Sequence, residues 1–178
     1  MNAIGTKLKD TYIITTKIFE DKRGSFIESF NLRDVQKIIG DYEFVQDCHS
    51  VSVKNVVRGL HYQIQHAQGK LLRCIAGEIY DVVVDLRQSS NTYGQWMGTR
   101  LTPGPKQLWV PPGLAHGFCA ISHQAEVLYK VTDYQYLEHE RTLLWDDRDL
   151  NINWGVASPI LSDKDFKGTP FKECDKYD

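Results

Sequence analysis

The sequence lacks any apolar segment long enough to cross a membrane. No run approaches the ~18 consecutive apolar residues of a transmembrane helix, and the first ten residues contain no apolar stretch typical of a secretory signal. Both absences predict a cytoplasmic protein with no membrane partner. Basic and acidic residues nearly balance, at 21 and 23, and no block of like charge occurs, so electrostatics gives no reason to expect a nucleic-acid partner.

Cysteine is rare in this sequence, and its four positions lie far apart. None forms a CxxC pair, and none has the spacing of a zinc site. We therefore expect reduced thiols, with Cys74 and Cys119 packed as small hydrophobic side chains because both lie in apolar runs. A chain of 178 residues with 42% hydrophobic types can bury a core without disulfides or metals.

Short strand-like segments follow one another along most of the chain. From Tyr12 onward, runs rich in β-branched and apolar residues are separated by turn residues. The main exception is 31–39, where apolar side chains recur at helical spacing and Gly40 can end a helix. Many short strands at near-regular spacing predict one all-β domain over residues 1–178, a sandwich or barrel. The tail over about 150–178 is expected to consist of loops and one short helix.

Two stretches carry most of the reactive side chains. The first is RGLHYQ over residues 58–63, followed by Lys70 and Gly77, and the second is PPGLAHGF over residues 111–118. A histidine-containing strand motif followed by PxGxxH resembles the cupins. The resemblance implies a cupin-type jelly-roll barrel with a few short helices.

The residues inside these motifs argue against a metal site. Metal-binding cupins have two histidines two residues apart and a glutamate seven residues before a glycine. Here Gln63 follows His61, and Lys70 precedes Gly77, at those spacings. A protonated lysine has no lone pair and repels a divalent cation. We predict no metal and no cofactor; the alternative, a metal-dependent cupin enzyme, is disfavoured by these two substitutions.

Further motifs occur in a consistent order along the chain. They are DKRG at 21–24, FIES at 26–29, FVQD at 44–47, QGKL at 68–71, GEIYDV at 77–82, QLWVP at 107–111, AHGF at 115–118 and LYK at 128–130. Together with RGLHYQ they resemble the dTDP-4-dehydrorhamnose 3,5-epimerase family. The resemblance implies an isomerase of deoxysugar and polysaccharide biosynthesis. It would invert C3 and C5 of dTDP-4-dehydro-6-deoxy-D-glucose through an enolate, giving dTDP-4-dehydro-L-rhamnose.

The resemblance also assigns catalytic roles. A C4 ketone acidifies the protons on both neighbouring carbons, so a base, an acid and donors for the enolate oxygen suffice for the reaction. By resemblance, His61 is the base, and Tyr129 is the acid on the opposite face. Asp165 orients the imidazole, with Asp163 as the alternative. The full catalytic set that matches the family is His61, Lys70, His116, Tyr129 and Asp165, in which the lysine and the second histidine face the C4 oxygen.

The resemblance also assigns substrate-binding residues. The matching residues are Arg23, Phe26, Glu28, Gln46, Arg58, Asp81 and Tyr134. The two arginines are assigned to the pyrophosphate, which suits the forked guanidinium. The family forms homodimers with exchanged N-terminal strands, so we expect a homodimer in which an arm of about residues 1–30 reaches the partner subunit.

The chain departs from the family pattern around the substrate. Cys48 stands where the family usually has Asn, and Gln135 stands where a second tyrosine is common. These departures leave open a single-site C3 or C5 epimerase acting on a related nucleotide sugar. A catalytically idle sugar-nucleotide binding module is a further alternative, which the complete acid–base set argues against.

Overall fold

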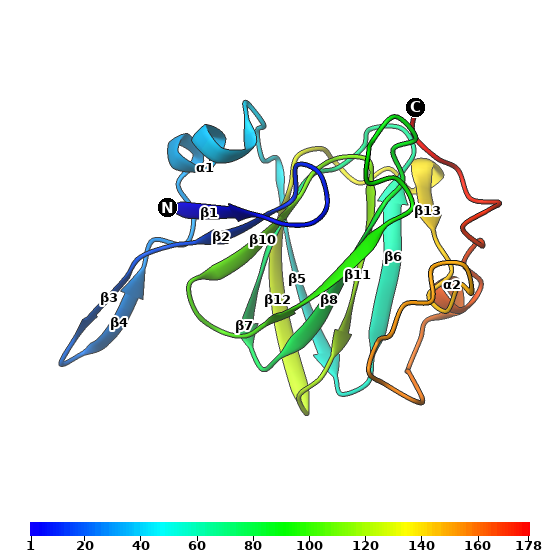
Figure 1. The fold of residues 1–178 in the computed structure, drawn as a ribbon. Helices are drawn as coiled ribbons and strands as arrows, with labels where there is room; N and C mark the ends of the chain where they lie inside the picture. Colours follow the sequence, from blue (N-terminus) through cyan, green and yellow to red (C-terminus); the bar gives the residue numbers. More distant parts are fainter.

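Two antiparallel sheets face each other in the computed structural model, which describes residues 1–178 (Figure 1). The larger sheet has six strands, in the order β1 (Asn2–Gly5), β2 (Tyr12–Thr15), β10 (Lys106–Val110), β7 (Lys70–Ala76), β12 (Gln124–Val131) and β5 (Gln46–Val53). The smaller sheet has five, in the order β13 (Glu140–Thr142), β6 (Val57–Gln63), β11 (Leu114–Ala120), β8 (Ile79–Asp85) and β9 (Trp96–Leu101). The predicted all-β class is confirmed.

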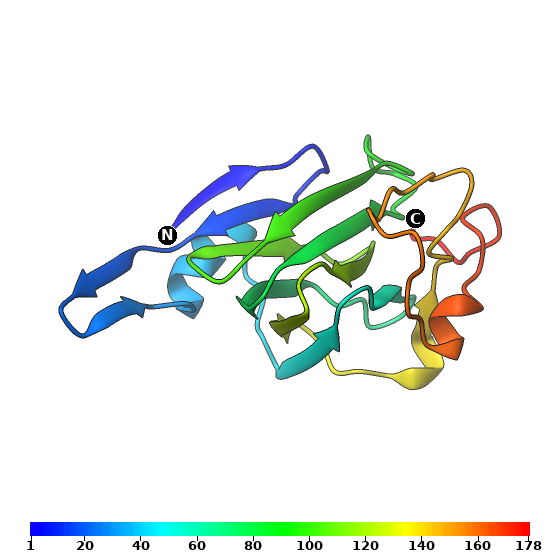
Figure 2. The ribbon, with the colours of Figure 1, turned by 90° about the horizontal axis from the view of Figure 1, so that it is seen from below.

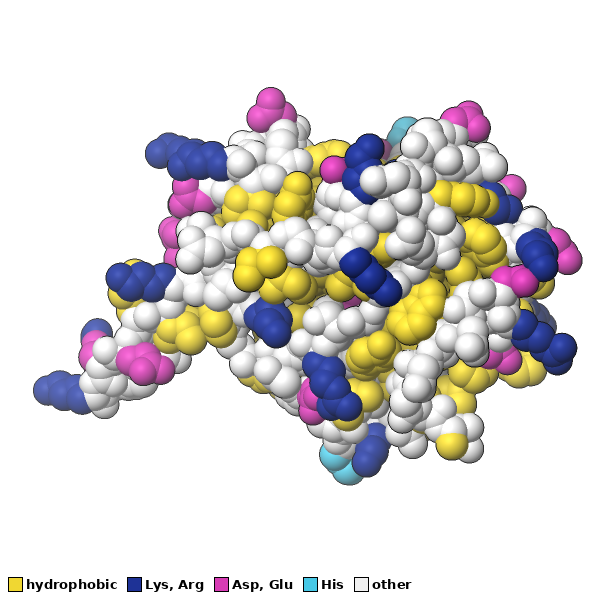
Figure 3. Space-filling view, viewed as in Figure 1, with side chains coloured by type: hydrophobic (Ala, Val, Ile, Leu, Met, Phe, Trp, Pro, Cys, Tyr) yellow, Lys and Arg dark blue, Asp and Glu magenta, His cyan; other side chains and the backbone are white.

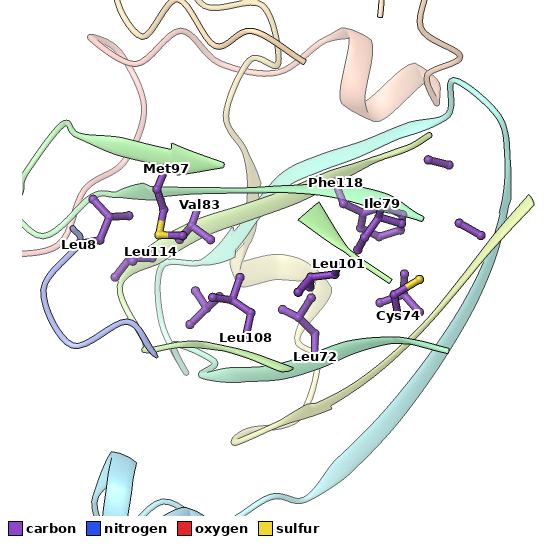
Figure 4. Packing of buried hydrophobic residues seen from close by; sticks show 14 residues of the cluster. Leu8, Leu72, Cys74, Ile79, Val83, Met97, Leu101, Leu108, Leu114 and Phe118 are labelled. Atoms are coloured by element: carbon purple, nitrogen blue, oxygen red, sulfur yellow. The ribbon is translucent and has the colours of Figure 1, made fainter. Parts of the chain in front are cut away.

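Hydrophobic side chains fill much of the space between the sheets. Alternate residues of a strand point to the same face, so Leu72 and Leu108 from the large sheet meet Ile79, Val83 and Phe118 from the small one (Figure 4). This cluster contains 14 buried residues and includes Cys74. Toward β5 and β6, by contrast, the inward positions are largely polar. The packed region therefore acts as a rigid scaffold for a polar site beside it.

The outer faces of both sheets are covered by segments from the two ends of the chain. Helix α1 (Leu32–Ile39) packs Val35 against Trp109 of the large sheet. The C-terminal tail runs along the small sheet, where Trp154 joins its outward residues in a second buried cluster (Figure 2). As predicted, that tail is mostly loops with one short helix, α2 (Asp163–Phe166), and a single 3-10 turn, η1 (Leu137–His139), precedes β13. No helix is long and apolar enough to span a bilayer.

A two-stranded hairpin, β3 (Ile18–Asp21) with β4 (Gly24–Ile27), projects away from the barrel (Figure 1). The space-filling view shows hydrophobic surface along this arm and charged side chains toward its tip (Figure 3). Phe19 and Phe26 are 50% and 66% exposed. Large aromatic side chains left in water on an extended arm are typical of a surface that contacts another chain.

Candidate active site

Two histidines meet where β6 and β11 pair. His61 and His116 are register partners, one from each strand. The strands approach closely because both carry glycine: a Cβ on Gly59 would lie 2.5 Å from the Cα atom of Gly117, and Gly59 has a φ of +121°. The glycines of the RGLH and HGF motifs therefore permit the close packing that brings the two imidazoles together.

The C-terminal tail supplies a carboxylate to His61. The His61 Nε2 atom lies 2.5 Å from Asp165 Oδ1, across 104 positions of the sequence. Asp165 is 3% exposed, and its backbone N–H donates to the Ser162 hydroxyl at the start of α2. Burial acts to raise the pKa of Asp165, but the hydrogen bond and charge of His61, together with Ser162 and Lys164, outweigh it and lower the pKa. The carboxylate is thus ionised, Nε2 carries the proton, and the basic lone pair is on Nδ1. Asp163, the predicted alternative, is exposed.

Lys70 is a cation held almost out of water. Its side chain comes from the start of β7, the residue is 8% exposed, and its ammonium donates to the backbone carbonyl of His61 at 3.2 Å. Burial lowers its pKa to about 8. An ammonium has three N–H donors, so two remain for a ligand.

His116 has a buried carboxylate partner of its own. Its Nε2 atom lies 2.8 Å from Asp81 Oδ2, and Asp81 is fully buried. Burial raises the pKa of Asp81, and its other oxygen, Oδ1, has no hydrogen-bond partner. The structure thus places Asp81 behind His116, where it orients the imidazole rather than facing the cavity.

Tyr129 provides a phenol on the large sheet, opposite the histidine strands. Burial raises its pKa to about 12, with a further contribution from the neighbouring Cys48. The hydroxyl therefore keeps its proton at neutral pH and can donate it. Tyr129 lines the same two cavities as His61 and Lys70, with volumes of about 240 and 80 Å³.

Three further residues line the larger of these cavities without having been predicted. Glu140 and Lys164 form an ion pair at 2.7 Å, and both face the cavity. Ser50, on the inward face of β5, has a buried hydroxyl without a partner. Each is an isolated polar residue in an unremarkable sequence context, so no spacing rule could have found it.

The remaining predicted residues are divided between the cavities and the arm. Gln46 lines the smaller cavity and Arg58 the larger. Glu28 lines a separate cavity of about 350 Å³ beside β7 and β12. The structure does not bring the other three to the cavity that holds the histidines: Arg23 and Phe26 lie on the projecting hairpin, and Tyr134 is 56% exposed.

The donor set of this cavity does not suit a metal ion. No group of three or more His, Cys, Asp or Glu side chains is arranged to hold one. His61 and His116 each have a carboxylate partner, and the ammonium of Lys70 lies beside them. The arrangement instead offers an oriented base, a neutral acid and a cation around one space, which is the equipment for moving protons next to a developing negative charge.

Known proteins are similar to this chain in both sequence and fold. A family model described as dTDP-4-dehydrorhamnose 3,5-epimerase matches residues 5–173. Proteins of that name from Shigella flexneri and Pseudomonas aeruginosa are 49% and 47% identical, with 99% of each chain covered. The crystal structure of a dTDP-6-deoxy-D-glucose-3,5-epimerase from Legionella pneumophila, in complex with dTDP-4-keto-L-rhamnose, superposes with a TM-score of 0.94 at 42% identity, covering 98% of this chain and 94% of that one. The chain belongs to the dTDP-4-dehydrorhamnose 3,5-epimerase family.

Proposed function

We propose that this chain is an isomerase that inverts C3 and C5 of dTDP-4-dehydro-6-deoxy-D-glucose, giving dTDP-4-dehydro-L-rhamnose. The observation that carries the proposal is the shared cavity in which His61, backed by Asp165, lies with Tyr129 and Lys70. The match along nearly the whole chain to 3,5-epimerases, one of them crystallised with a dTDP-4-keto sugar, supports the same substrate.

Proton abstraction falls to His61. The ketone at C4 acidifies the protons at C3 and C5, and the imidazole takes one of them through Nδ1. The imidazolium that forms is stabilised by the Asp165 carboxylate, which also fixes the ring and its tautomer. Because Asp165 is buried and ionised, it performs this role without accepting the proton itself.

Negative charge then develops on the C4 oxygen. The ammonium of Lys70 and the imidazole of His116, both almost fully buried, are the donors placed to receive it in the cavity that they line. Asp81 keeps His116 oriented for this purpose. The hydroxyl of Tyr129 delivers a proton to the carbon from the face opposite His61. This inverts the centre. His61 then loses its proton to solvent and Tyr129 regains one from solvent, so the same steps can invert the second carbon.

A homodimer with exchanged arms would complete the binding site. Arg23 and Phe26 were expected to bind the nucleotide, yet in one chain they lie on the projecting hairpin, away from the cavity. We propose that the hairpin of each subunit reaches the nucleotide site of its partner, where Arg58 provides a second guanidinium for the pyrophosphate. Exposed Phe26 would then be covered by the partner subunit or the bound nucleotide.

The function is tested by incubating the purified protein with the dTDP-linked 4-keto-6-deoxyglucose in heavy water and reading the product by NMR. The proposal predicts deuterium at both C3 and C5 together with inversion of both centres. Label and inversion at only one carbon would instead identify a single-site epimerase. Absence of label from both carbons would refute an epimerase of either kind.

A further inference from the structure

The inward face of β5 is polar along its whole length and borders the acid of the active site. Gln46, Cys48, Ser50 and Ser52 alternate with exposed outward residues. Ser52 accepts a hydrogen bond from Arg58, and Gln46 and Ser50 line the cavities. Cys48 has no part in the proposed acid–base steps, although it lines the smaller cavity with Tyr129.

Cys48 lies directly across from Tyr129. The two are register partners in the antiparallel pair of β5 and β12, a position that brings Cβ atoms to about 4.5–5.5 Å. Both side chains line the smaller cavity, and the nearby thiol contributes to the raised pKa of the phenol. The thiol is itself held by the side-chain amide of Gln46, whose Nε2 donates to Sγ at 3.3 Å.

The same amide connects the thiol to the rim of the cavity. Gln46 Oε1 accepts a hydrogen bond from the backbone N–H of Gln135 at 3.4 Å. The side chain of Gln135 lines both cavities. One amide therefore links the rim to the thiol, and the thiol lies across from the phenol.

The other three cysteines have different surroundings. Cys74, Cys119 and Cys174 are buried, and each thiol donates to a nearby backbone carbonyl. Cys48 alone is partly exposed, and its thiol accepts from the side chain of Gln46 in the active-site wall. Its environment is that of a residue that supports the site, whereas theirs is that of core packing.

We propose that Cys48 is a positioning residue for Tyr129: its thiol, fixed by Gln46, keeps the phenolic hydroxyl directed at the sugar carbon on the face opposite His61. The inference rests on the proposed acid role of Tyr129. A phenol that loses this contact can turn its O–H away. The enolate then recovers a proton from His61 on the original face, so that exchange occurs without inversion.

An assay of Cys48→Ala in heavy water distinguishes exchange with inversion from exchange without inversion. The ratio of inverted product to total deuterium incorporation should fall by about tenfold or more, in line with the usual contribution of a positioned acid. Exchange itself continues, since His61 and Lys70 are untouched. Cys48→Ser, whose hydroxyl can contact both Gln46 and the phenol, should restore the ratio to near that of the unmodified protein. Cys119→Ala is the matched control and should leave the ratio unchanged.

Gln46→Met provides a second variant should Cys48→Ala fail to fold. Removing the amide frees the thiol, so the same ratio should fall, whatever happens to KM. An unchanged ratio in either folded variant would overturn the inference, and so would an equal loss of exchange and inversion, which indicates general damage. Failure of the proposed function is distinguishable from both results, because the unmodified protein would then incorporate no deuterium at all.

Discussion

Lys70 is a buried cation, and in the proposed mechanism it donates to the enolate oxygen. Burial lowers its pKa from 10.5 to about 8, so holding the ammonium charged at neutral pH opposes folding. The penalty applies fully below pH 8 and is relieved as the pH rises from about 8 toward the unfolded value of 10.5. In the proposed mechanism, this poorly hydrated cation stabilises the negative charge on the enolate oxygen.

Replacing this lysine should increase the stability of the protein and decrease its activity. Lys70→Met removes the buried charge, so the free energy of unfolding at pH 7 should rise by about 1–3 kcal/mol, somewhat less than the full pKa shift would give. The value of kcat should fall by about 10²–10³-fold through loss of the oxyanion donor. Urea unfolding and steady-state kinetics measure the two effects. Lys37→Met, at an exposed ion pair, is the control and should change stability by less than about 0.5 kcal/mol.

The same residue should set the alkaline limit of the reaction. The ammonium is the active form, so kcat/KM, which reports the pKa values of the free enzyme, should decline as the pH rises through about 8. In Lys70→Arg the guanidinium stays charged, and whatever activity survives should lose this decline. A pH–rate profile of both proteins tests this, and a flat profile from pH 7 to pH 10 in the unmodified protein would contradict it.

Among the structural elements, the rim of the cavity depends on one buried side chain at the end of β6. Gln63 stands where metal-binding cupins have a second histidine, and it is 3% exposed. Its amide donates to the carbonyls of His66 and Tyr134 and accepts from the N–H of Tyr136. It therefore fixes two loops, and with them Gln135, which lines the cavity between those contacts.

Gln63→Leu should loosen that rim while sparing the acid and base. Three backbone groups would lose their partner, at a cost of about 1–3 kcal/mol for each one that stays buried. KM should rise by about tenfold and kcat should change less, because binding now includes ordering the loops. Gln36→Leu removes a single bond to the carbonyl of Tyr42 and should leave KM unaffected. A normal KM in Gln63→Leu would show that the loops are held by other contacts.

Strands and helices whose hydrophobic residues recur with a clear period could be predicted from the sequence, and elements without such a period could not. Helix α1 was predicted over 31–39 and spans Leu32–Ile39, although the Asn31 side chain donates to Glu28 instead of capping it. Strands β1 and β13 were missed: one is fully exposed and the other has three residues, so neither has a hydrophobic alternation. Asp165 was assigned through family resemblance, because no local signal pairs residues 104 positions apart.

At the level of the whole molecule, the proposed site is complete only when two subunits contribute to it. The hairpin arm exposes Phe19 and Phe26 and carries Arg23 away from its own cavity. An arm exchanged across a two-fold axis would bury those rings and bring a guanidinium to each nucleotide site.

Mixing two inactive variants tests the exchange. His61→Ala removes the base of its own cavity, and Arg23→Ala damages the arm that serves the other cavity. Subunits unfolded together and refolded at equal concentration form hybrid dimers in half of the cases, and one of the two sites in each hybrid is intact. Activity should recover to about a quarter of the unmodified level. No recovery, with hybrid dimers verified by mass, would indicate that each arm serves its own chain.

In the proposed reaction, His61 and Tyr129 act from opposite faces of one keto-sugar ring. This arrangement is tested most directly by following deuterium exchange and inversion separately in His61→Ala and Tyr129→Phe, both verified as folded. We expect His61→Ala to abolish exchange and inversion together, whereas Tyr129→Phe should continue to exchange but invert poorly. Exchange at the normal rate in His61→Ala, or normal inversion in Tyr129→Phe, would contradict it.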